Sequence, residues 1–558
     1  MKKLATRIQT AGAALVVSGA VLAIAPSAIA KDVLTIGRAQ FPTALNPYLG
    51  SASVNQHTIG FASRPISAFM SDGKPACLLC AELPTLENGL AKFETRPDGS
   101  KGLSVTIKLR PELKWGDGTS VSSKDIYFTW LVGKDPASGL TSQNSWGRAS
   151  DVEIVDSQTA ILHLTKPFVT FQMWDHLLPE HLEGPIKAAA VTPIDYINKS
   201  LYTVTPTNPG LWNGPYVISG YASGDRVTLS PNKYWSGTQP HFRQVVIRTI
   251  ENTSALMANL LSGDVDMSPS GGITSDQAVT LERDHAKEFQ FFWRSAMQLE
   301  RINVQTDNKA LADLNVRKAL ILAIDRKTLV ERLFSGRATV ADTWINDLEP
   351  NYTTEGVVTY PFDPKKARDI LEAAGWKAGA DGVRRNSAGD RLVFEFTTTS
   401  GNAARSLSQQ VLQSQWKSVG IQVNLKNEPG RTFFGETMRK REFKGLSEYG
   451  RYAFIGVPPT NYFHSSQLPT AENNYSGTNW TGFRIPEFDA LLVEAETELD
   501  RSKQKAIWAK MQKIYSEQLI EIPLYFRQDP DVVPVWIKNY QSTGKESYQS
   551  YTAENWSE

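Results

Sequence analysis

The chain has 558 residues, with 41% hydrophobic and 21% charged side chains. This length predicts several domains around a sizeable core, and the composition excludes a chain that is disordered throughout. The formal net charge of +1 becomes −2 once the three basic residues of a predicted leader are removed. Neither a basic excess nor a basic block is present, so nucleic acid and an anionic membrane surface are excluded as partners.

The first thirty residues have the three parts of a secretory signal peptide. Three basic residues lie within the first seven positions, residues 11–25 are apolar, and Ala28-Ile29-Ala30 forms a small-x-small cleavage site. The apolar run is shorter than the ~20 residues that span a bilayer, and no stop-transfer pattern follows. We therefore expect cleavage before Lys31 and, because no cysteine stands there, a soluble mature protein without a lipid anchor.

The two cysteines, Cys77 and Cys80, are separated by Leu-Leu. In an exported chain, two thiols at this spacing predict a local disulfide, because the compartment is oxidising. A redox motif is the alternative, but it needs a strand-to-helix junction, whereas these cysteines lie in a predicted loop before Pro84. A zinc site would need two further ligands, and no histidine lies nearby in the sequence.

The first two hundred residues predict a mixture of strands and short helices. A strand is expected from Val33, and alternating apolar residues over 105–109 predict a half-buried strand. After a tight turn, Ser122 or Ser123 can cap a helix over 125–130.

The stretch Thr207–Trp235 predicts a hairpin around which the rest of the chain is organised. Asn208-Pro209-Gly210 marks a turn, and the β-prone run Tyr216-Val217-Ile218 follows. Gly224-Asp225 supplies the turn, and Val227-Thr228-Leu229 runs back. About two hundred residues precede this hairpin and three hundred follow it, which indicates that the chain returns here to an earlier domain.

The second half of the chain predicts a further α/β unit. A strand over 301–304 is expected to cross over into it, and alternating strands over 392–398 and 421–425 flank a helix over 404–417. Such a strand-helix-strand unit predicts parallel pairing. Chain order predicts two lobes and an extra domain joined by crossovers. A last strand over 522–526 is expected to cross back to the first lobe.

The sequence contains no motif typical of catalysis or of metal binding. Gly-x-Ser-x-Gly and the phosphate-binding loop are absent. Ser-x-x-Lys occurs, for example at Ser414–Lys417 and Ser542–Lys545, but the Ser-Asp-Asn and Lys-Thr-Gly motifs that accompany it in active-site-serine acyl enzymes do not. His176 and His181 lie near acidic residues but miss the zincin spacing. The segment from Asp264 begins like a calcium loop but has Pro269 where glycine is needed. We therefore predict no catalytic residues, no metal site and no cofactor.

Several short motifs of the sequence resemble those of one family, the bacterial extracytoplasmic solute-binding proteins of family 5. This family contains the oligopeptide- and dipeptide-binding proteins of ABC importers. The motifs include Lys-Trp-x-Asp-Gly-Thr and the helix Asp-Ile-x-Phe-Thr-Trp that follows it. The segments that carry the resemblance are 114–119, 125–130, 213–216, 232–235, 259–266, 316–326 and 361–376. They occur in family order and cover essentially all of the mature chain.

The resemblance implies an α/β fold of the periplasmic-binding-protein type II-like class (cluster C). Two lobes joined by a hinge and an extra small domain are expected. The implied boundaries are 1–30 for the signal peptide, 31–50, 206–301 and 522–558 for lobe I, 51–205 for the small domain, and 302–521 for lobe II.

The resemblance also implies which loops face the ligand cleft. The candidate ligand-binding residues are Phe41, Asn46, Trp146, Trp212, Arg451, Tyr452 and Phe454. Peptide-binding members carry an aspartate in the loop that matches 449–459, where it pairs with the α-amine of the ligand. Here no carboxylate lies between Glu448 and Glu472, although Glu448 could substitute from a different angle. We expect Arg451 to face an anionic group of the ligand, or alternatively to pair with Glu448 at the rim.

The function implied is a monomeric periplasmic receptor that closes its lobes on a peptide or similarly sized polar solute and delivers it to the permease subunits of an ABC importer. A secreted cell-envelope hydrolase on a two-lobed scaffold is the alternative. Such a receptor is expected to have no enzymatic activity and to bind its ligand without turnover.

Overall fold

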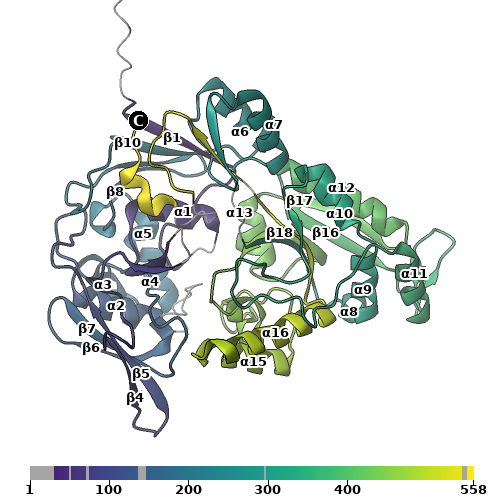
Figure 1. Ribbon diagram of the computed structural model, residues 1–558, viewed down its shortest axis with the longest axis horizontal. Helices are drawn as coiled ribbons and strands as arrows, with labels where there is room; N and C mark the ends of the chain where they lie inside the picture. Colours follow the sequence, from purple (N-terminus) through teal and green to yellow (C-terminus); the bar gives the residue numbers. More distant parts are fainter. Residues whose placement is uncertain are drawn as a thin grey trace, which may run out of the picture. The chain divides into compact units, whose positions relative to one another are not determined.

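The computed structural model describes residues 31–49, 52–70, 74–135, 146–293, 297–528, 530–542 and 549–558. The predicted signal peptide, residues 1–30, lies outside the described residues. Residues Asp32–Glu558 form one compact unit. Its secondary structure is mixed α/β, and its larger sheets define two lobes and a small domain (Figure 1).

Lobe I is organised around a four-stranded sheet. The strands are β1 (Val33–Arg38), β8 (Tyr216–Ala222), β9 (Arg226–Pro231) and β10 (Gln244–Thr249), in the order β1-β10-β9-β8. β8 and β9 form the predicted hairpin, with a register shift between Ile218 and Gly220. The turn contains Gly224 at a φ of +82°, a conformation that glycine adopts without strain. β1 lies parallel to β10, so the hairpin does return the chain to its first strand.

Short helices and strands follow β1 and β10 in the chain. α1 (Ser53–Ala62), β2 (Ser67–Phe69) and β3 (Pro75–Cys77) lie in the range predicted for the small domain, whereas α6 (Thr253–Ser262) and α7 (Ser275–His285) lie in the range predicted for lobe I. Cys77 and Cys80 form the predicted disulfide, with 5.2 Å between their Cα atoms.

The small domain is built on an antiparallel sheet. Its strands are β4 (Ala91–Thr95), β5 (Lys101–Lys108), β6 (Ala149–Ile154) and β7 (Thr159–Leu164), in the order β4-β5-β7-β6. Helices α2 (Ser123–Gly133), α3 (Glu180–Ala189), α4 (Pro193–Lys199) and α5 (Leu201–Val204) accompany it. Ser122, and not Ser123, is the N-cap of α2, where the backbone N–H of Ser122 donates to Asp125. One continuous apolar core runs through this sheet and the sheet of lobe I.

Lobe II is organised around a six-stranded sheet. The strands are β12 (Gln298–Val304), β13 (Thr339–Val340), β16 (Val393–Thr399), β17 (Gln422–Glu428), β18 (Gly445–Tyr452) and β19 (Glu521–Phe526). Their order is β13-β19-β12-β18-β16-β17. Helix α12 (Ala403–Lys417) connects β16 to β17, which pair in parallel as predicted.

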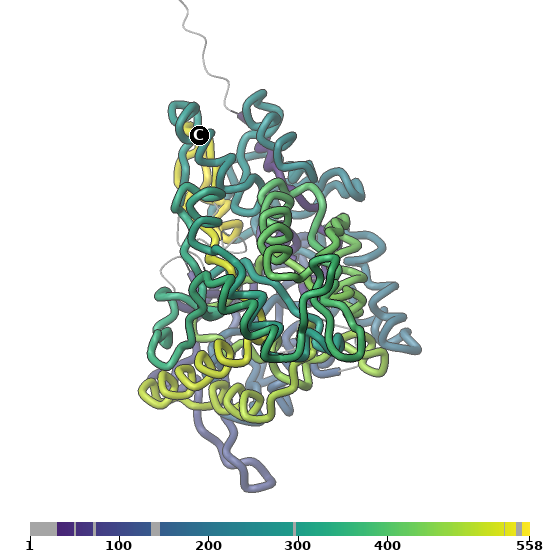
Figure 2. Tube along the Cα trace, turned by 90° about the vertical axis from the view of Figure 1, so that its right-hand side faces the viewer, coloured from purple at the N-terminus to yellow at the C-terminus, as the bar shows by residue number. Residues whose placement is uncertain are grey.

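The remaining helices of lobe II contribute apolar side chains to its core. They are α8 (Lys309–Ala312), α9 (Leu314–Leu322), α10 (Arg326–Phe334), α11 (Pro364–Ala373), α13 (Gly430–Thr432), α14 (Thr460–Phe463), α15 (Pro486–Thr497) and α16 (Arg501–Gln518). Figure 2 shows α15 and α16 as adjacent yellow-green tubes, and they bury an aromatic cluster around Trp344 and Trp508. β14 (Lys377–Ala378) and β15 (Arg384–Arg385) form a two-stranded sheet.

The chain leaves and re-enters lobe I next to a two-stranded sheet. β11 (Phe289–Phe292) pairs with β20 (Asp531–Pro534), and their neighbours in sequence are β12 and β19. The strand over 522–526 was expected to cross to lobe I, but β19 pairs with β12 and β13 inside the sheet of lobe II. The chain reaches lobe I only beyond Phe526, at β20. None of the helices in the described ranges combines the length and apolarity that crossing a bilayer requires.

Candidate functional site

One edge of the lobe II sheet collects the ends of several strands. β16, β17 and β18 run parallel and end at Thr399, Glu428 and Tyr452. β12 runs the opposite way and begins at this edge, since Gln298 pairs with Tyr452, while β19 ends here at Phe526. Ligands of open α/β sheets bind beyond the carboxyl ends of the strands. We call this edge the carboxyl edge, and it is also where the chain arrives from β11 and departs to β20.

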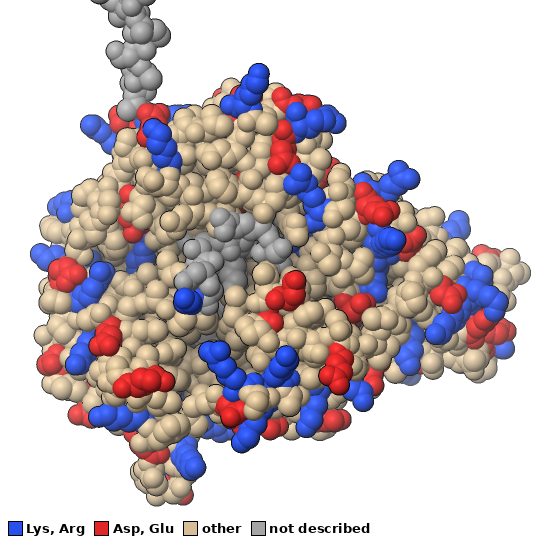
Figure 3. Space-filling view, viewed as in Figure 1, with Lys and Arg blue, Asp and Glu red and all other residues tan. Residues whose placement is uncertain are grey.

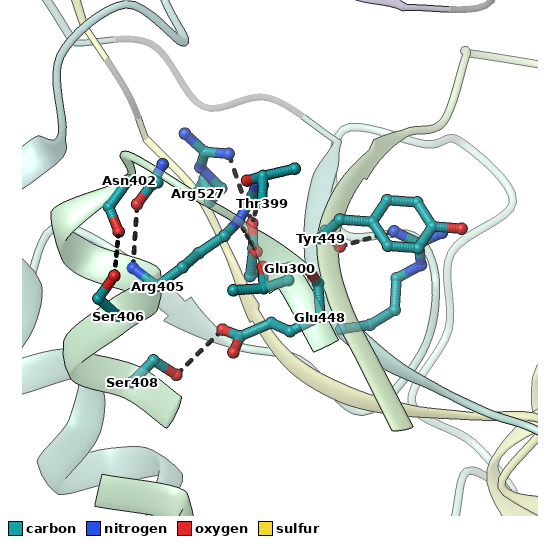
Figure 4. Close-up of polar contacts among 11 residues, drawn as sticks. Glu300, Thr399, Asn402, Arg405, Ser406, Ser408, Glu448, Tyr449 and Arg527 are labelled. Carbon is teal, nitrogen blue, oxygen red and sulfur yellow. Dashed lines mark hydrogen bonds and ion pairs between the residues drawn. The ribbon is translucent and has the colours of Figure 1, made fainter. Parts of the chain in front are cut away.

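A buried ionic cluster lies just inside the carboxyl edge. Glu300 of β12, which is 1% exposed, accepts hydrogen bonds from Arg405 of α12 at 2.7 and 3.4 Å. Arg527, directly beyond β19, donates to the same carboxylate at 3.4 Å. Burial opposes ionisation of Glu300, but the guanidinium of Arg405 and then that of Arg527 outweigh it and lower the pKa of this carboxyl. Figure 4 shows Arg405 and Arg527 converging on Glu300.

Glu448 of β18 is the second buried carboxyl of this cluster. Its Oε1 accepts a hydrogen bond from Ser408 Oγ of α12 at 3.0 Å (Figure 4). Its backbone oxygen accepts one from Thr398 Oγ1 at 2.7 Å. Its Oε2 is buried without a hydrogen-bond partner in the described part of the chain. Burial, and next the neighbouring charge of Glu300, raises the pKa of Glu448 to about 8. Glu448 is therefore an uncharged carboxylic acid at neutral pH.

Arg451 lies in a second buried cluster, three residues along β18. Its two terminal nitrogens donate to the two oxygens of Glu521 at 3.0 and 2.8 Å, and Arg301 Nε donates to Glu521 Oε1 at 3.0 Å. The guanidinium of Arg451 also lies 4.5 Å from the ring centre of Tyr462. The expected alternative, a pair between Arg451 and Glu448 at the rim, is wrong, because Arg451 reaches across β12 to Glu521 on β19, whereas the Glu448 side chain contacts α12.

The other predicted ligand-binding residues divide into two groups. Phe41, Tyr452 and Phe454 are half-buried. Phe41 follows β1 of lobe I and lies 5.4 Å from the ring of Tyr221, whereas Tyr452 ends β18 and Phe454 follows it. Each of the three therefore stands at or beyond the carboxyl end of a strand.

Asn46, Trp146 and Trp212 are almost completely buried, with 0–2% of their surface exposed. The structure brings Asn46 and Trp146 together at Tyr48, whose backbone N–H donates to Asn46 and whose hydroxyl accepts from the Trp146 indole at 2.7 Å. The Trp212 indole donates to the backbone oxygen of Pro206 at 3.0 Å. Their side chains offer almost no surface to a ligand in this structure, and their role in binding remains a prediction.

A pocket of about 270 Å³ opens at the carboxyl edge beside β13 and β19. Its lining includes Asp342, Tyr352, Phe526, Arg527 and Gln528. Arg527 thus belongs both to the pocket wall and to the ionic cluster around Glu300. The pocket and the cluster therefore share one side chain.

The sequence analysis did not single out Glu300, Arg405 or Arg527. A usable signal was nevertheless present, because the opposite charges of Glu300 and Arg301 are adjacent within a strand. Every residue of that strand, β12, is buried. Charged residues are almost never fully buried unless they are paired. Adjacent opposite charges in such a strand indicate partners on neighbouring elements, but they do not identify those partners.

The surface shows no large patch of one charge on the face in Figure 3, where acidic and basic residues alternate. Within the described ranges, no group of three or more His, Cys, Asp or Glu side chains is arranged to hold a metal ion. His181 instead contacts Asp117 at 2.8 Å, and His176 contacts Ser63 at 3.0 Å.

Comparison with protein families gives one match that covers most of the chain. Residues 85–474 match the model described as "Bacterial extracellular solute-binding proteins, family 5 Middle". The oligopeptide-binding protein OppA of Bacillus subtilis is 23% identical over 546 residues, which cover 92% of this chain and 90% of that protein.

Solved structures with the same fold bind chemically different ligands. The oligopeptide-binding protein of Thermus thermophilus, solved with a pentapeptide, has a TM-score of 0.85 and 27% identity, covering 94% of this chain and 96% of the other. NikZ of Campylobacter jejuni, solved with Ni(L-His), has a TM-score of 0.79 and 21% identity, covering 95% and 100%. A mannohexaose-bound protein of Thermotoga maritima has a TM-score of 0.78 and 20% identity, covering 94% and 97%.

Proposed function

Because this chain belongs to family 5 of the bacterial extracellular solute-binding proteins, we propose that it captures a peptide or similarly sized polar solute and delivers it to the permease subunits of an ABC importer. The observation that carries this proposal is the family match over residues 85–474, together with the likeness over almost the whole chain to a pentapeptide-binding protein. The hydrolase alternative is not favoured, since the relatives compared are binding proteins.

The solute binds between the lobes, at the carboxyl edge of lobe II. Phe41 from lobe I and Tyr452 and Phe454 from lobe II are the proposed contacts, because all three are partly exposed and stand at strand ends. Aromatic faces suit flat and apolar parts of a solute as well as sugar rings. The related structures were solved with a peptide, a nickel–histidine complex and an oligosaccharide, so the fold alone does not select the solute.

The mature protein acts in the periplasm, and we propose that it does so as a monomer. The predicted leader and its cleavage site at Ala28-Ile29-Ala30, which lacks a cysteine for lipid attachment, support the periplasmic location. Expression of the full chain in a bacterium and measurement of the intact mass of the periplasmic product test the assignment. We expect a mass that begins at Lys31. A product that retains the leader, or that carries acyl chains, would contradict it.

The solute itself is identified by binding without turnover. The purified mature protein is mixed with an equimolar set of synthetic pentapeptides and nonapeptides, and separately with oligosaccharides and nickel–histidine, and its complexes are examined by native mass spectrometry. We expect stoichiometric binding of an unaltered peptide. Recovery of cleaved peptide, in amounts that grow with time, would instead support the hydrolase. Binding of sugar or metal complex alone would overturn the peptide assignment.

A further inference from the structure

The two buried carboxyls of this cluster, Glu300 and Glu448, differ in their partners inside lobe II. Arg405 and Arg527 both bind Glu300, whereas Glu448 has a hydroxyl donor, Ser408, and one oxygen with no hydrogen-bond partner in the described ranges. An ionised carboxylate buried in this way would be costly, and a second carboxylate beside the first makes it costlier. The site therefore suits one negative charge and one proton.

Glu448 interacts electrostatically with four charged or titratable groups on neighbouring segments. These are Glu300 on β12, Arg405 on α12, Tyr525 on β19 and Arg527 beyond β19. Arg301 and Arg451 bind Glu521 instead. β16 contributes the uncharged Thr398 and Thr399. Burial raises the pKa of Tyr525 far above its ordinary value. The pKa of Glu300 is lowered. Glu448 is thus the group of this cluster that changes charge in mildly alkaline solution.

Three segments that hold the cluster meet at the carboxyl edge. β18 ends there at Tyr452, α12 begins there with Arg405 in its first turn, and Arg527 lines the pocket. Gly450 keeps β18 close to the cluster, since a Cβ atom there would lie 3.0 Å from Glu300 Oε2 and 3.1 Å from Arg527. An ionised Glu448 would compete with Glu300 for Arg405 and Arg527, which would displace the pocket wall and the end of β18 together.

We propose that Glu448 is a positioning residue that keeps the carboxyl edge in its solute-binding geometry only while it holds its proton, so that solute affinity falls in alkaline solution. This inference rests on the solute-binding role proposed above. It requires no contact between Glu448 and the solute. The proton leaves Glu448 for solvent, and the resulting carboxylate draws a guanidinium from Glu300.

The test compares wild type with Glu448→Gln, which keeps the shape of the uncharged acid and cannot ionise. The probe is the equimolar mixture of synthetic pentapeptides and nonapeptides, and the affinity of the bound peptide is measured by calorimetry from about pH 7 to about pH 9.5. For one coupled proton, wild-type affinity falls by up to about tenfold per pH unit above the transition. Glu448→Gln shows no such fall. The control Glu487→Gln makes the same side-chain change at an exposed position of lobe II and follows wild type.

A second variant keeps the inference testable if Glu448→Gln does not fold. The Ser408 hydroxyl favours the ionised form of Glu448, so Ser408→Ala shifts the loss of affinity to higher pH. An unchanged profile in Ser408→Ala, or an equal fall in wild type and Glu448→Gln, overturns the proposal.

If no peptide binds to wild type at any pH, the peptide assignment fails, and a ligand-free measurement decides this inference. Amide hydrogen exchange of residues 449–458, corrected for the intrinsic effect of pH, is compared between wild type and Glu448→Gln. Faster corrected exchange at alkaline pH in wild type alone supports the positioning role. The same exchange in both proteins overturns it.

Discussion

At the scale of single residues, lobe II places an unusual number of charges in its interior. The cluster of Arg301, Arg451 and Glu521 has two guanidiniums on one carboxylate, and all three side chains are at most 6% exposed. The excess positive charge faces aromatic rings, with Arg301 3.7 Å from the ring centre of Tyr449. Aromatic faces attract cations, which makes this arrangement tolerable without a second carboxylate.

The Arg451–Glu521 contact gives an asymmetric prediction for stability. Glu521→Gln leaves two buried guanidiniums without their counter-ion and is expected to lower the free energy of unfolding by about 3–5 kcal/mol. Arg451→Met leaves the Arg301–Glu521 pair intact and is expected to cost less, about 1.5–3 kcal/mol. Urea unfolding of both variants measures the difference. A larger loss for Arg451→Met than for Glu521→Gln would show that the arginine, and not the carboxylate, is central to the cluster.

The raised pKa of Glu448 predicts a pH dependence of stability. Between its ordinary pKa of 4.5 and its folded value of about 8, the folded protein keeps a proton that the unfolded chain releases. The free energy of unfolding therefore falls as pH rises through this window, by up to about 1.4 kcal/mol per pH unit from this group. Glu448→Gln removes that contribution. Denaturation at several pH values should show the stability of Glu448→Gln relative to wild type rising with pH and levelling off above about pH 8. A constant difference would contradict the assignment.

At the scale of elements, the ends of strands and helices explain why these residues meet. β12, β18 and β19 are neighbours in the lobe II sheet although they are far apart in the sequence. Helix α12 starts at the carboxyl edge, where the Asn402 side chain accepts from the backbone N–H of Arg405 and fixes the first turn. Arg405 in that turn then reaches Glu300. The position of a helix N-terminus thus decides which strand its first charged residue contacts.

The disulfide at the end of β3 is expected to contribute little to stability. Cys77 and Cys80 are three residues apart, and closing so short a loop removes little chain entropy, about 2 kcal/mol in the loop-closure model. The double variant Cys77→Ser/Cys80→Ser should fold and lose about that amount, measured by thermal or urea unfolding. Labelling of the native wild-type protein with a thiol reagent serves as the control and should find no reactive sulfur. Loss of folding in the double variant would contradict this view.

At the scale of the whole molecule, the proposed function requires movement between the lobes. The chain passes from β11 to β12 and from β19 to β20, so both connections between the lobes lie beside the proposed solute site. Segments at the ends of elements are typical hinges. Binding at the carboxyl edge would therefore be coupled directly to the geometry of these connections.

Solute binding is expected to make the molecule more compact. A solute bound with micromolar affinity supplies about −8 kcal/mol, which is enough to shift an open–closed equilibrium of a few kcal/mol. Small-angle scattering with and without saturating solute should show a smaller radius of gyration in the complex, and tryptophan fluorescence should change in step. Identical scattering profiles would count against closure. A non-binding peptide serves as the control.

The sequence by itself determined the elements and their approximate order. The hairpin β8–β9, the capped helix α2, the parallel pair β16–β17 and the Cys77–Cys80 disulfide were all predicted, because turn residues, caps and alternating apolar residues act over a few positions. Only the tertiary structure decided the partners of buried charges. Arg451 pairs with Glu521 and not with Glu448, because strand order in the sheet, set by long-range packing, brings β18 next to β12 and places β19 on its far side. The same packing buried Trp146 and Trp212 and turned Glu448 into an uncharged acid, since burial is a property of the folded chain and not of any local pattern.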